Sequence, residues 1–152
     1  MQNRCHESEA IPADVRAESR IVMESWCWAV GIPQTAQAMF WWGAFTEWCV
    51  ASDQGIFADY AERGPLIIFR SRQTGFRWAL HPTTGEFRNA NNRRASWSGF
   101  ITRNPDIAAG LLMALPTLAP VEPPSIKTTL QGLAALTELM RYHARNNPVV
   151  VM

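Results

Sequence analysis

The chain of 152 residues has few cysteines, and their positions do not suggest a disulfide framework. Cys5, Cys27 and Cys49 are odd in number and far apart, and no two of them form a CxxC pair. Such cysteine usage fits a reducing compartment. Residues 1–7 also lack the apolar segment of a signal peptide, so we expect a cytoplasmic protein.

Motifs for metals, cofactors and nucleophiles are missing as well. The three histidines, His6, His81 and His143, fit no zinc spacing and no HExxH motif, and there is no acidic calcium loop. The glycines are too sparse for a GxGxxG or P-loop motif, and residues 96–99 do not match GxSxG. We therefore expect no metal, no cofactor and no catalytic residues of a familiar enzyme class.

No apolar run is long enough to cross a membrane. The most apolar window, residues 36–51, spans about 16 residues and contains Glu47, whereas a helical span needs about 20. The overall composition, 47% hydrophobic and 18% charged, is typical of a globular protein. A chain of this length can form one domain with its own hydrophobic core.

Lysine is nearly absent, since Lys127 is the single lysine beside thirteen arginines. Residues 64–103, the basic block, contain seven arginines and one acid, Glu86, for a net charge of +6. Residues 1–63 carry four arginines and nine acids, for a net charge of −5. Arginine donates paired hydrogen bonds to phosphates and stacks on aromatic rings, so the basic block is the first candidate for a binding site.

The basic block has the pattern of a three-stranded antiparallel meander. Its β-branched and aromatic runs, separated by glycine-containing turns, predict strands at residues 66–72, 76–81 and 86–88. In the second strand, alternation with period two separates an apolar face from a face that carries Arg77 and His81. We expect the apolar face to pack on helices and the other face to be exposed. The register between the first and second strands decides whether Arg70 or Arg72 lies beside Arg77 on the exposed face.

The rest of the chain is expected to be helical. Apolar stripes with start and stop signals predict helices at residues 13–30, 34–51, 54–62, 105–116 and 126–146, and a helical turn at residues 96–102. Prolines make residues 116–124 an extended connector, and the apolar tail 148–152 is expected to pair with a sheet edge or a second copy of the chain. The expected fold is α+β, with about five helices packed on the meander. It forms one domain with three parts: 1–63 helical and acidic, 64–103 basic, and 104–152 helical.

The leading hypothesis is a small non-enzymatic binding or regulatory protein that engages DNA or RNA through the basic block. Its arginines would contact phosphates, and its two tryptophans would stack on bases. The predicted site residues are Arg70, Arg72, Arg77, Trp78, His81, Arg88, Arg93, Arg94 and Trp97.

Three alternatives stay open. The same face could bind an acidic partner protein, with the chain acting as an inhibitor or regulator. The arginines could also form a solvated face without a partner, and the tryptophans could serve mainly as core residues. The weakest alternative is a hydrolase or transferase in which His81 and Glu86 perform acid–base catalysis, which requires both side chains to line one pocket.

Overall fold

The computed structural model describes residues 10–118, with side chains up to residue 114. The predicted connector 116–124, helix 126–146 and tail 148–152 therefore lie outside the described residues, apart from residues 116–118. Within residues 10–118 the chain forms five strands: β1 Ser19–Glu24, β2 Trp28–Pro33, β3 Ile67–Ser71, β4 Arg77–His81 and β5 Glu86–Asn89. They form one antiparallel sheet in chain order. The α+β class is confirmed, but the predicted meander is only the second part of a larger sheet.

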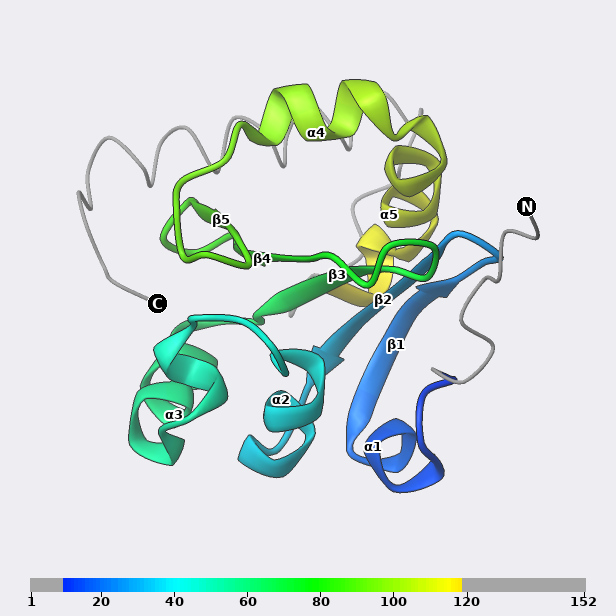
Figure 1. Cartoon of the computed structure of the whole chain (residues 1–152). Helices are drawn as coiled ribbons and strands as arrows, with labels where there is room; N and C mark the ends of the chain where they lie inside the picture. Colours follow the sequence, from blue (N-terminus) through cyan, green and yellow to red (C-terminus); the bar gives the residue numbers. More distant parts are fainter. Residues whose placement is uncertain (1–9, 119–152) are drawn as a thin grey trace.

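Helices cover both faces of this sheet (Figure 1). Those within residues 10–118 are α1 Ala13–Ala17, α2 Ala36–Trp42, the 3-10 helix η2 Cys49–Ala51, α3 Gln54–Arg63, α4 Trp97–Arg103 and α5 Pro105–Leu118. In Figure 1, α1, α2 and α3 lie below the sheet, and α4 and α5 lie above it. We name the two surfaces of the sheet after these helices, the α1–α3 face and the α4–α5 face.

The predicted helix 13–30 is wrong beyond residue 17. Residues 19–33 form the hairpin of β1 and β2 instead, closed by a turn in which Ser25 N donates to Trp28 O at 2.8 Å. β2 is buried along its whole length and therefore shows no alternation of apolar and polar residues. Spacing alone does not distinguish such a run from a buried helix. Gly31 lets α2 pack directly on this strand, because a Cβ there would lie 2.4 Å from the Trp42 ring.

The predicted helix 34–51 is also too long, because α2 ends at Trp42. Phe45 takes a left-handed φ of 64°, which interrupts the helix. The next segment is attached to the sheet, since Trp48 Nε1 donates to Asn89 O at 2.7 Å. Hydrogen bonds between residues so far apart cannot be inferred from local apolar spacing. The other predicted elements within the described residues are found in the structure: helices 54–62 and 105–116 and the helical turn 96–102 correspond to α3, α5 and α4, and the three predicted strands to β3, β4 and β5.

Each face of the sheet has its own hydrophobic core. The α4–α5 face buries Trp28, Val30, Phe69, Leu80, Phe87, Trp97, Phe100, Ile107 and Leu111, among others. The α1–α3 face buries Val15, Met39, Trp42, Trp48, Phe57, Tyr60, Leu66 and Ile68, among others. The prediction of an exposed sheet face is therefore wrong: Arg70, Arg77 and His81 are 1%, 7% and 0% exposed. Residues 10–63 were expected to be helical throughout. They instead supply two strands of the sheet and the helical layer that covers this face.

Candidate functional site

The register of β3, β4 and β5 places the charged residues of the basic block in cross-strand pairs. Arg70 lies opposite Arg77, and His81 lies opposite Glu86. Arg88 follows Glu86 by two positions on β5 and therefore shares its face. All of these residues lie on the α1–α3 face, whose core they border. The sequence thus predicted that Arg77 and His81 share a face, but not that helices cover it.

Trp78 and Trp97 lie on the opposite, α4–α5 face. Their ring centroids lie 5.1 and 6.1 Å from that of Phe100. Trp97 is buried, and its indole Nε1 has no hydrogen-bond partner among the described residues. A base cannot reach this ring, which rules out the stacking role predicted for Trp97. Trp78 is half-buried in the same aromatic cluster.

Three guanidinium groups gather where β3 ends and β4 begins, and we name Arg70, Arg72 and Arg77 the arginine cluster. Burial, together with the charges of Arg77 and Arg72, lowers the pKa of Arg70 to about 10. Burial also lowers the pKa of Arg77. Arginine nonetheless keeps its proton at neutral pH, so positive charge is concentrated under the helical layer. The Trp41 ring of α2 lies against Arg70, with its centroid 4.9 Å from Arg70 Cζ.

Backbone carbonyls accept the hydrogen bonds described for Arg72 and Arg77. Each donates from Nη1 to a carbonyl oxygen, at 2.8 and 2.9 Å respectively. Arg77 Nε is buried and has no hydrogen-bond partner among residues 10–118. Glu24 is held elsewhere: Arg16 donates to its two carboxylate oxygens at 3.0 and 2.7 Å. These hydrogen bonds lower the pKa of Glu24, and the charge of Arg72 contributes a smaller effect in the same direction.

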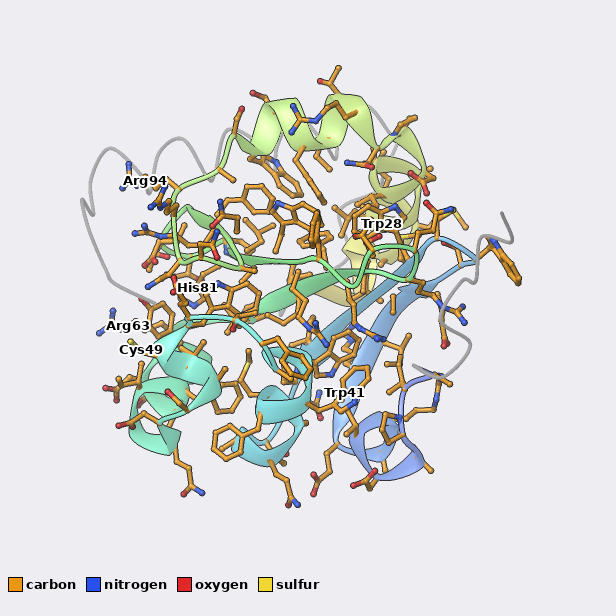
Figure 2. All side chains as sticks on the ribbon, in the orientation of Figure 1. Trp28, Trp41, Cys49, Arg63, His81 and Arg94 are labelled. Atoms are coloured by element: carbon orange, nitrogen blue, oxygen red, sulfur yellow. The ribbon has the colours of Figure 1, made fainter. Side chains whose placement is uncertain are left out.

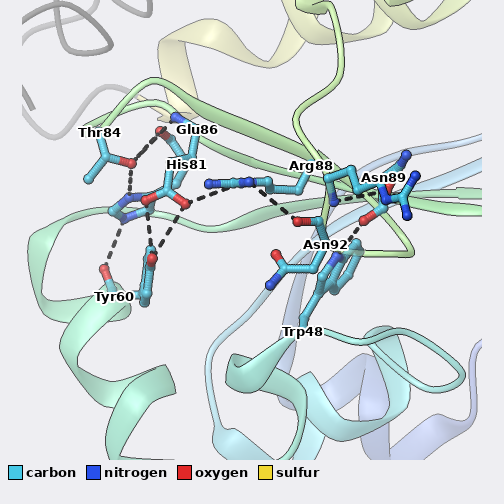
Figure 3. Close-up of polar contacts among 9 residues, drawn as sticks. Trp48, Tyr60, His81, Thr84, Glu86, Arg88, Asn89 and Asn92 are labelled. Atoms are coloured by element: carbon cyan, nitrogen blue, oxygen red, sulfur yellow. Dashed lines mark hydrogen bonds and ion pairs between the residues drawn. The ribbon is translucent and has the colours of Figure 1, made fainter. Parts of the chain in front are cut away.

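A second polar group on this face joins α3 to the β4–β5 hairpin (Figure 3). Tyr60 Oη donates to the Glu86 carboxylate at 3.1 Å, and Arg88 Nε lies 3.8 Å from Glu86 Oε2. His81 Nε2 lies 3.0 Å from the Tyr60 carbonyl oxygen, and His81 Nδ1 lies 2.9 Å from Thr84 Oγ1. Because a carbonyl oxygen only accepts, His81 carries a proton on Nε2. We name these five residues the Tyr60–Glu86 network.

The Tyr60–Glu86 network has the features of a buried structural contact between α3 and the β4–β5 hairpin. His81 and Glu86 share a face, but both are almost fully buried, and both ring nitrogens of His81 are engaged within the protein. Burial raises the pKa of Glu86, while the hydrogen bond from Tyr60 and the charge of Arg88 act in the opposite direction. Burial and the charge of Glu86 raise the pKa of Tyr60 well above its usual value, so the phenol stays protonated and donates. Both groups of the predicted catalytic pair are therefore buried in the interior and not exposed to solvent.

The loop between β5 and α4 carries two exposed arginines of the basic block, Arg93 and Arg94. Asn89 Oδ1 accepts from the backbone N–H of Asn91 at 3.0 Å and from that of Arg93 at 3.1 Å. Asn92 takes a left-handed φ of 57°, which asparagine tolerates. Arg94 then returns along β5 in an isolated β-bridge. We name the segment from Asn89 to Arg94 the basic loop.

The segment after α2 anchors the basic loop. Glu47 N donates to Ala90 O at 2.8 Å, next to the hydrogen bond of the Trp48 indole. Arg93 and Arg94 are exposed, and no acid among the described residues forms an ion pair with either of them. Figure 2 shows Arg94 at the outer edge of the molecule. The other predicted arginines, Arg70, Arg72, Arg77 and Arg88, are buried or half-buried.

The predicted site residues did not include Trp41 and Tyr60, which contact Arg70 and Glu86. Their side chains come from α2 and α3, at a distance in sequence from the basic block. The docking of these helices on the sheet brings the aromatic rings to the charged groups. Spacing within the basic block therefore carried no signal that could have identified them.

Neither a membrane span nor a metal site is found among the described residues, and no known protein matches the chain. No helix within residues 10–118 is long and apolar enough to cross a membrane. In the same range, no three His, Cys, Asp or Glu side chains come together in a way that could hold a metal ion. The expected cytoplasmic location, and self-association through residues 148–152, stay predictions. Compared with protein-family models, curated proteins and solved structures, the chain has no match.

Proposed function

We propose that this protein binds nucleic acid, DNA or RNA, through the basic loop. The observation that carries the proposal is the presentation of Arg93 and Arg94. Both are exposed, on a loop held in place by its own hydrogen bonds and by one each from Glu47 N and the Trp48 indole. Guanidinium groups donate paired hydrogen bonds to phosphate oxygens. A loop that is already ordered loses little conformational entropy on binding. Arg70, Arg77 and His81 do not belong to this surface, because they are buried.

The distribution of exposed charge supports the same surface. Exposed acids within residues 10–118 are Asp14, Glu24, Glu47, Asp53, Asp59, Glu62 and Asp106. All but Asp106 lie in residues 10–63, where Glu47 is next to the basic loop through its backbone hydrogen bond to Ala90. The exposed side chains Arg93, Arg94 and Arg103 lie beyond the sheet's last strand. A phosphate backbone that approaches from the side of β5 and α4 would therefore meet mainly positive charge.

The polarity of the basic loop favours nucleic acid over an acidic protein. Between Asn89 and Arg94, the single apolar residue is Ala90. Protein–DNA interfaces are polar and strongly positive. Protein–protein interfaces instead centre on apolar and aromatic anchor residues, which the basic loop does not supply.

The proposal is tested by the salt dependence of binding. Fluorescence anisotropy would measure the affinity of labelled duplex DNA, single-stranded DNA and RNA at several salt concentrations. The logarithm of the binding constant falls linearly with the logarithm of the salt concentration. Each lost phosphate contact reduces the magnitude of this log–log slope by about 0.9 on duplex DNA and by about 0.7 on single strands. The double variant Arg93→Ala/Arg94→Ala should therefore have a slope smaller by about 1.8 on duplex or about 1.4 on single strands.

The matched control is Arg16→Ala, which also removes an exposed arginine. Arg16 contacts Glu24 of β1, at the edge of the sheet opposite β5, so its loss should leave the slope unchanged. Labelled polyglutamate serves as a further probe. If polyglutamate binds through Arg93 and Arg94 while nucleic acids do not, the partner is an acidic protein and the nucleic-acid proposal fails. Absence of binding to any nucleic acid at low salt also contradicts it.

A further inference from the structure

Phe45, in the segment between α2 and η2, presents its aromatic ring to solvent. It is 95% exposed, more than Trp26, Phe76 or Met113, which are 66%, 62% and 79% exposed. Apolar surface left in water forgoes the free energy that burial provides. Exposure alone does not assign the ring a role, because single exposed hydrophobic residues are common. The backbone of Phe45 supplies a second observation.

Phe45 lies in a tight turn, in a conformation that a bulky residue rarely adopts. Thr46 donates from its backbone N and from its hydroxyl to Gly43 O, at 3.1 and 2.6 Å, and so closes a turn over residues 43–46. Phe45 is the third residue of this turn and has a φ of 64°, where glycine or asparagine is favoured. Stability alone therefore does not account for a phenylalanine here, and strained residues of this kind cluster at ligand sites.

Backbone hydrogen bonds hold the turn of Phe45 against the basic loop. Glu47 N donates to Ala90 O at 2.8 Å. Phe45 precedes Glu47 by two residues, so their Cα atoms are at most about 7 Å apart. Within the loop, Asn89 N donates to Arg93 O at 2.9 Å, which brings Arg93 back beside the start of the loop. The turn that carries Phe45 and the loop that carries Arg93 therefore lie side by side, and both side chains are exposed.

We infer that the basic loop and Phe45 together bind single-stranded nucleic acid, with the Phe45 ring stacked on an unpaired base. This inference rests on the proposed function and names the class of nucleic acid. Proteins that bind single strands combine positive groups along the phosphates with aromatic rings on which bases stack. In a duplex the bases stack on each other, and a protein side chain does not reach their faces. A duplex therefore contacts Arg93 and Arg94, whereas a single strand contacts Phe45 as well.

One exposed ring suits a base better than it suits a partner protein. Protein interfaces centre on several apolar and aromatic anchor residues that pack together. The other large hydrophobic residues exposed within residues 10–114 come from other elements: Trp26 from the turn between β1 and β2, Phe76 from the turn between β3 and β4, and Met113 from α5. Stacking on a base requires a single accessible ring, which Phe45 provides.

The experiment compares the wild type with Phe45→Leu, which keeps an apolar side chain and removes the ring. Fluorescence anisotropy measures the affinity for labelled oligothymidylate, oligouridylate and duplex DNA. Phe45→Leu should bind one or both single strands about 5- to 150-fold more weakly, the loss expected when one base loses its stacking partner. Its affinity for duplex DNA, and its log–log salt slope on every probe, should equal those of the wild type, because no charge is removed.

Two controls separate stacking from a change in the loop. An abasic oligonucleotide keeps the phosphates but has no base to stack, so Phe45→Leu and the wild type should bind it equally. The matched control variant is Trp26→Leu, which removes an exposed aromatic ring at the edge of the sheet opposite β5. Trp26→Leu should bind every probe as the wild type does.

Two results would overturn the inference and leave the proposed function standing. One is equal affinity of Phe45→Leu and the wild type for both single strands, while Arg93→Ala/Arg94→Ala still reduces the salt slope. The other is an equal loss of affinity of Phe45→Leu for the intact and the abasic strand, which would show that the turn supports the loop and that the ring does not hold a base. Absence of binding to any nucleic acid would overturn both proposals.

Discussion

The two faces of the sheet differ in chemistry although the same strands supply both. On the α4–α5 face, the strands contribute apolar and aromatic side chains that pack against α4 and α5. On the α1–α3 face, Arg70, Arg77, His81 and Glu86 are buried beside apolar residues. Buried charges cost free energy relative to apolar side chains of the same size, so stability alone does not explain them. Both faces thus carry a hydrophobic core, and the α1–α3 face in addition buries these four ionisable side chains.

The largest effect expected from this difference is at Phe100, the centre of the aromatic cluster. Its ring centroid lies 5.1–6.1 Å from those of Trp28, Phe69, Trp78, Phe87 and Trp97. Phe100→Ala leaves a cavity in this packing and should lower the free energy of unfolding by about 3–5 kcal/mol. Denaturant-induced unfolding measures the loss. Arg77→Met, on the other face, should show none, and a loss for Arg77→Met as large as that for Phe100→Ala would contradict the difference between the faces.

A second prediction concerns the pH dependence of stability at Glu86. Burial raises its pKa above the usual value of 4.5, so the folded protein holds this proton more tightly than the unfolded chain. The stabilisation is fully present below the unfolded pKa and is lost as the pH rises through the folded pKa. The unfolding free energy of the wild type minus that of Glu86→Gln should therefore fall as the pH rises from the unfolded pKa to the folded pKa.

Glu24 provides the matched control with the opposite sign. Hydrogen bonds from Arg16 lower its pKa, so its contribution is present above the unfolded pKa and is lost as the pH falls through the folded pKa. The difference curve for Glu24→Gln should rise with pH in the window below the usual pKa of 4.5, whereas that for Glu86→Gln falls in the window above it. The amplitude for Glu24→Gln should be smaller because Glu24 is exposed. Difference curves that change with pH in the same direction for the two variants would show that burial does not raise the pKa of Glu86.

The smallest effect is expected at Trp48, which links the α1–α3 layer to the basic loop. Trp48→Phe keeps an aromatic ring but removes the hydrogen bond from Nε1 to Asn89 O, at a cost of about 1 kcal/mol in unfolding free energy. A looser loop should bind nucleic acid more weakly than the wild type, yet better than Arg93→Ala/Arg94→Ala. Unchanged affinity in anisotropy titrations, together with lower stability, would show that this anchor does not order the binding surface.

The part of the fold that the sequence predicted is the part in which local signals are strong. The turns that close β3–β4 and β4–β5 contain Gly75 and Gly85 at φ of 76° and 75°, where glycine is favoured. These turns make β3, β4 and β5 neighbours in the sheet, so their order was accessible from the sequence, whereas the register, and with it the pairing of Arg70 with Arg77, was not. β1 and β2 were not, because their apolar residues match a helical stripe as well as a strand.

The candidate site was predictable only in part. Arg93 and Arg94 follow a short strand in a polar segment, and the structure places them on an exposed loop. The burial of Arg70 and Arg77 depends on the packing of α2 on β2, where Gly31 admits the Trp42 ring. Such packing between segments distant in sequence leaves no local pattern. The sequence therefore identified the charged residues but not which of them reach solvent.

The most direct test of the proposed function is the salt dependence of duplex DNA binding, measured side by side for the wild type, Arg93→Ala/Arg94→Ala and Arg16→Ala. We predict a log–log slope that is smaller by about 1.8 for the double variant and unchanged for Arg16→Ala. The same slope for all three proteins would contradict binding through the basic loop.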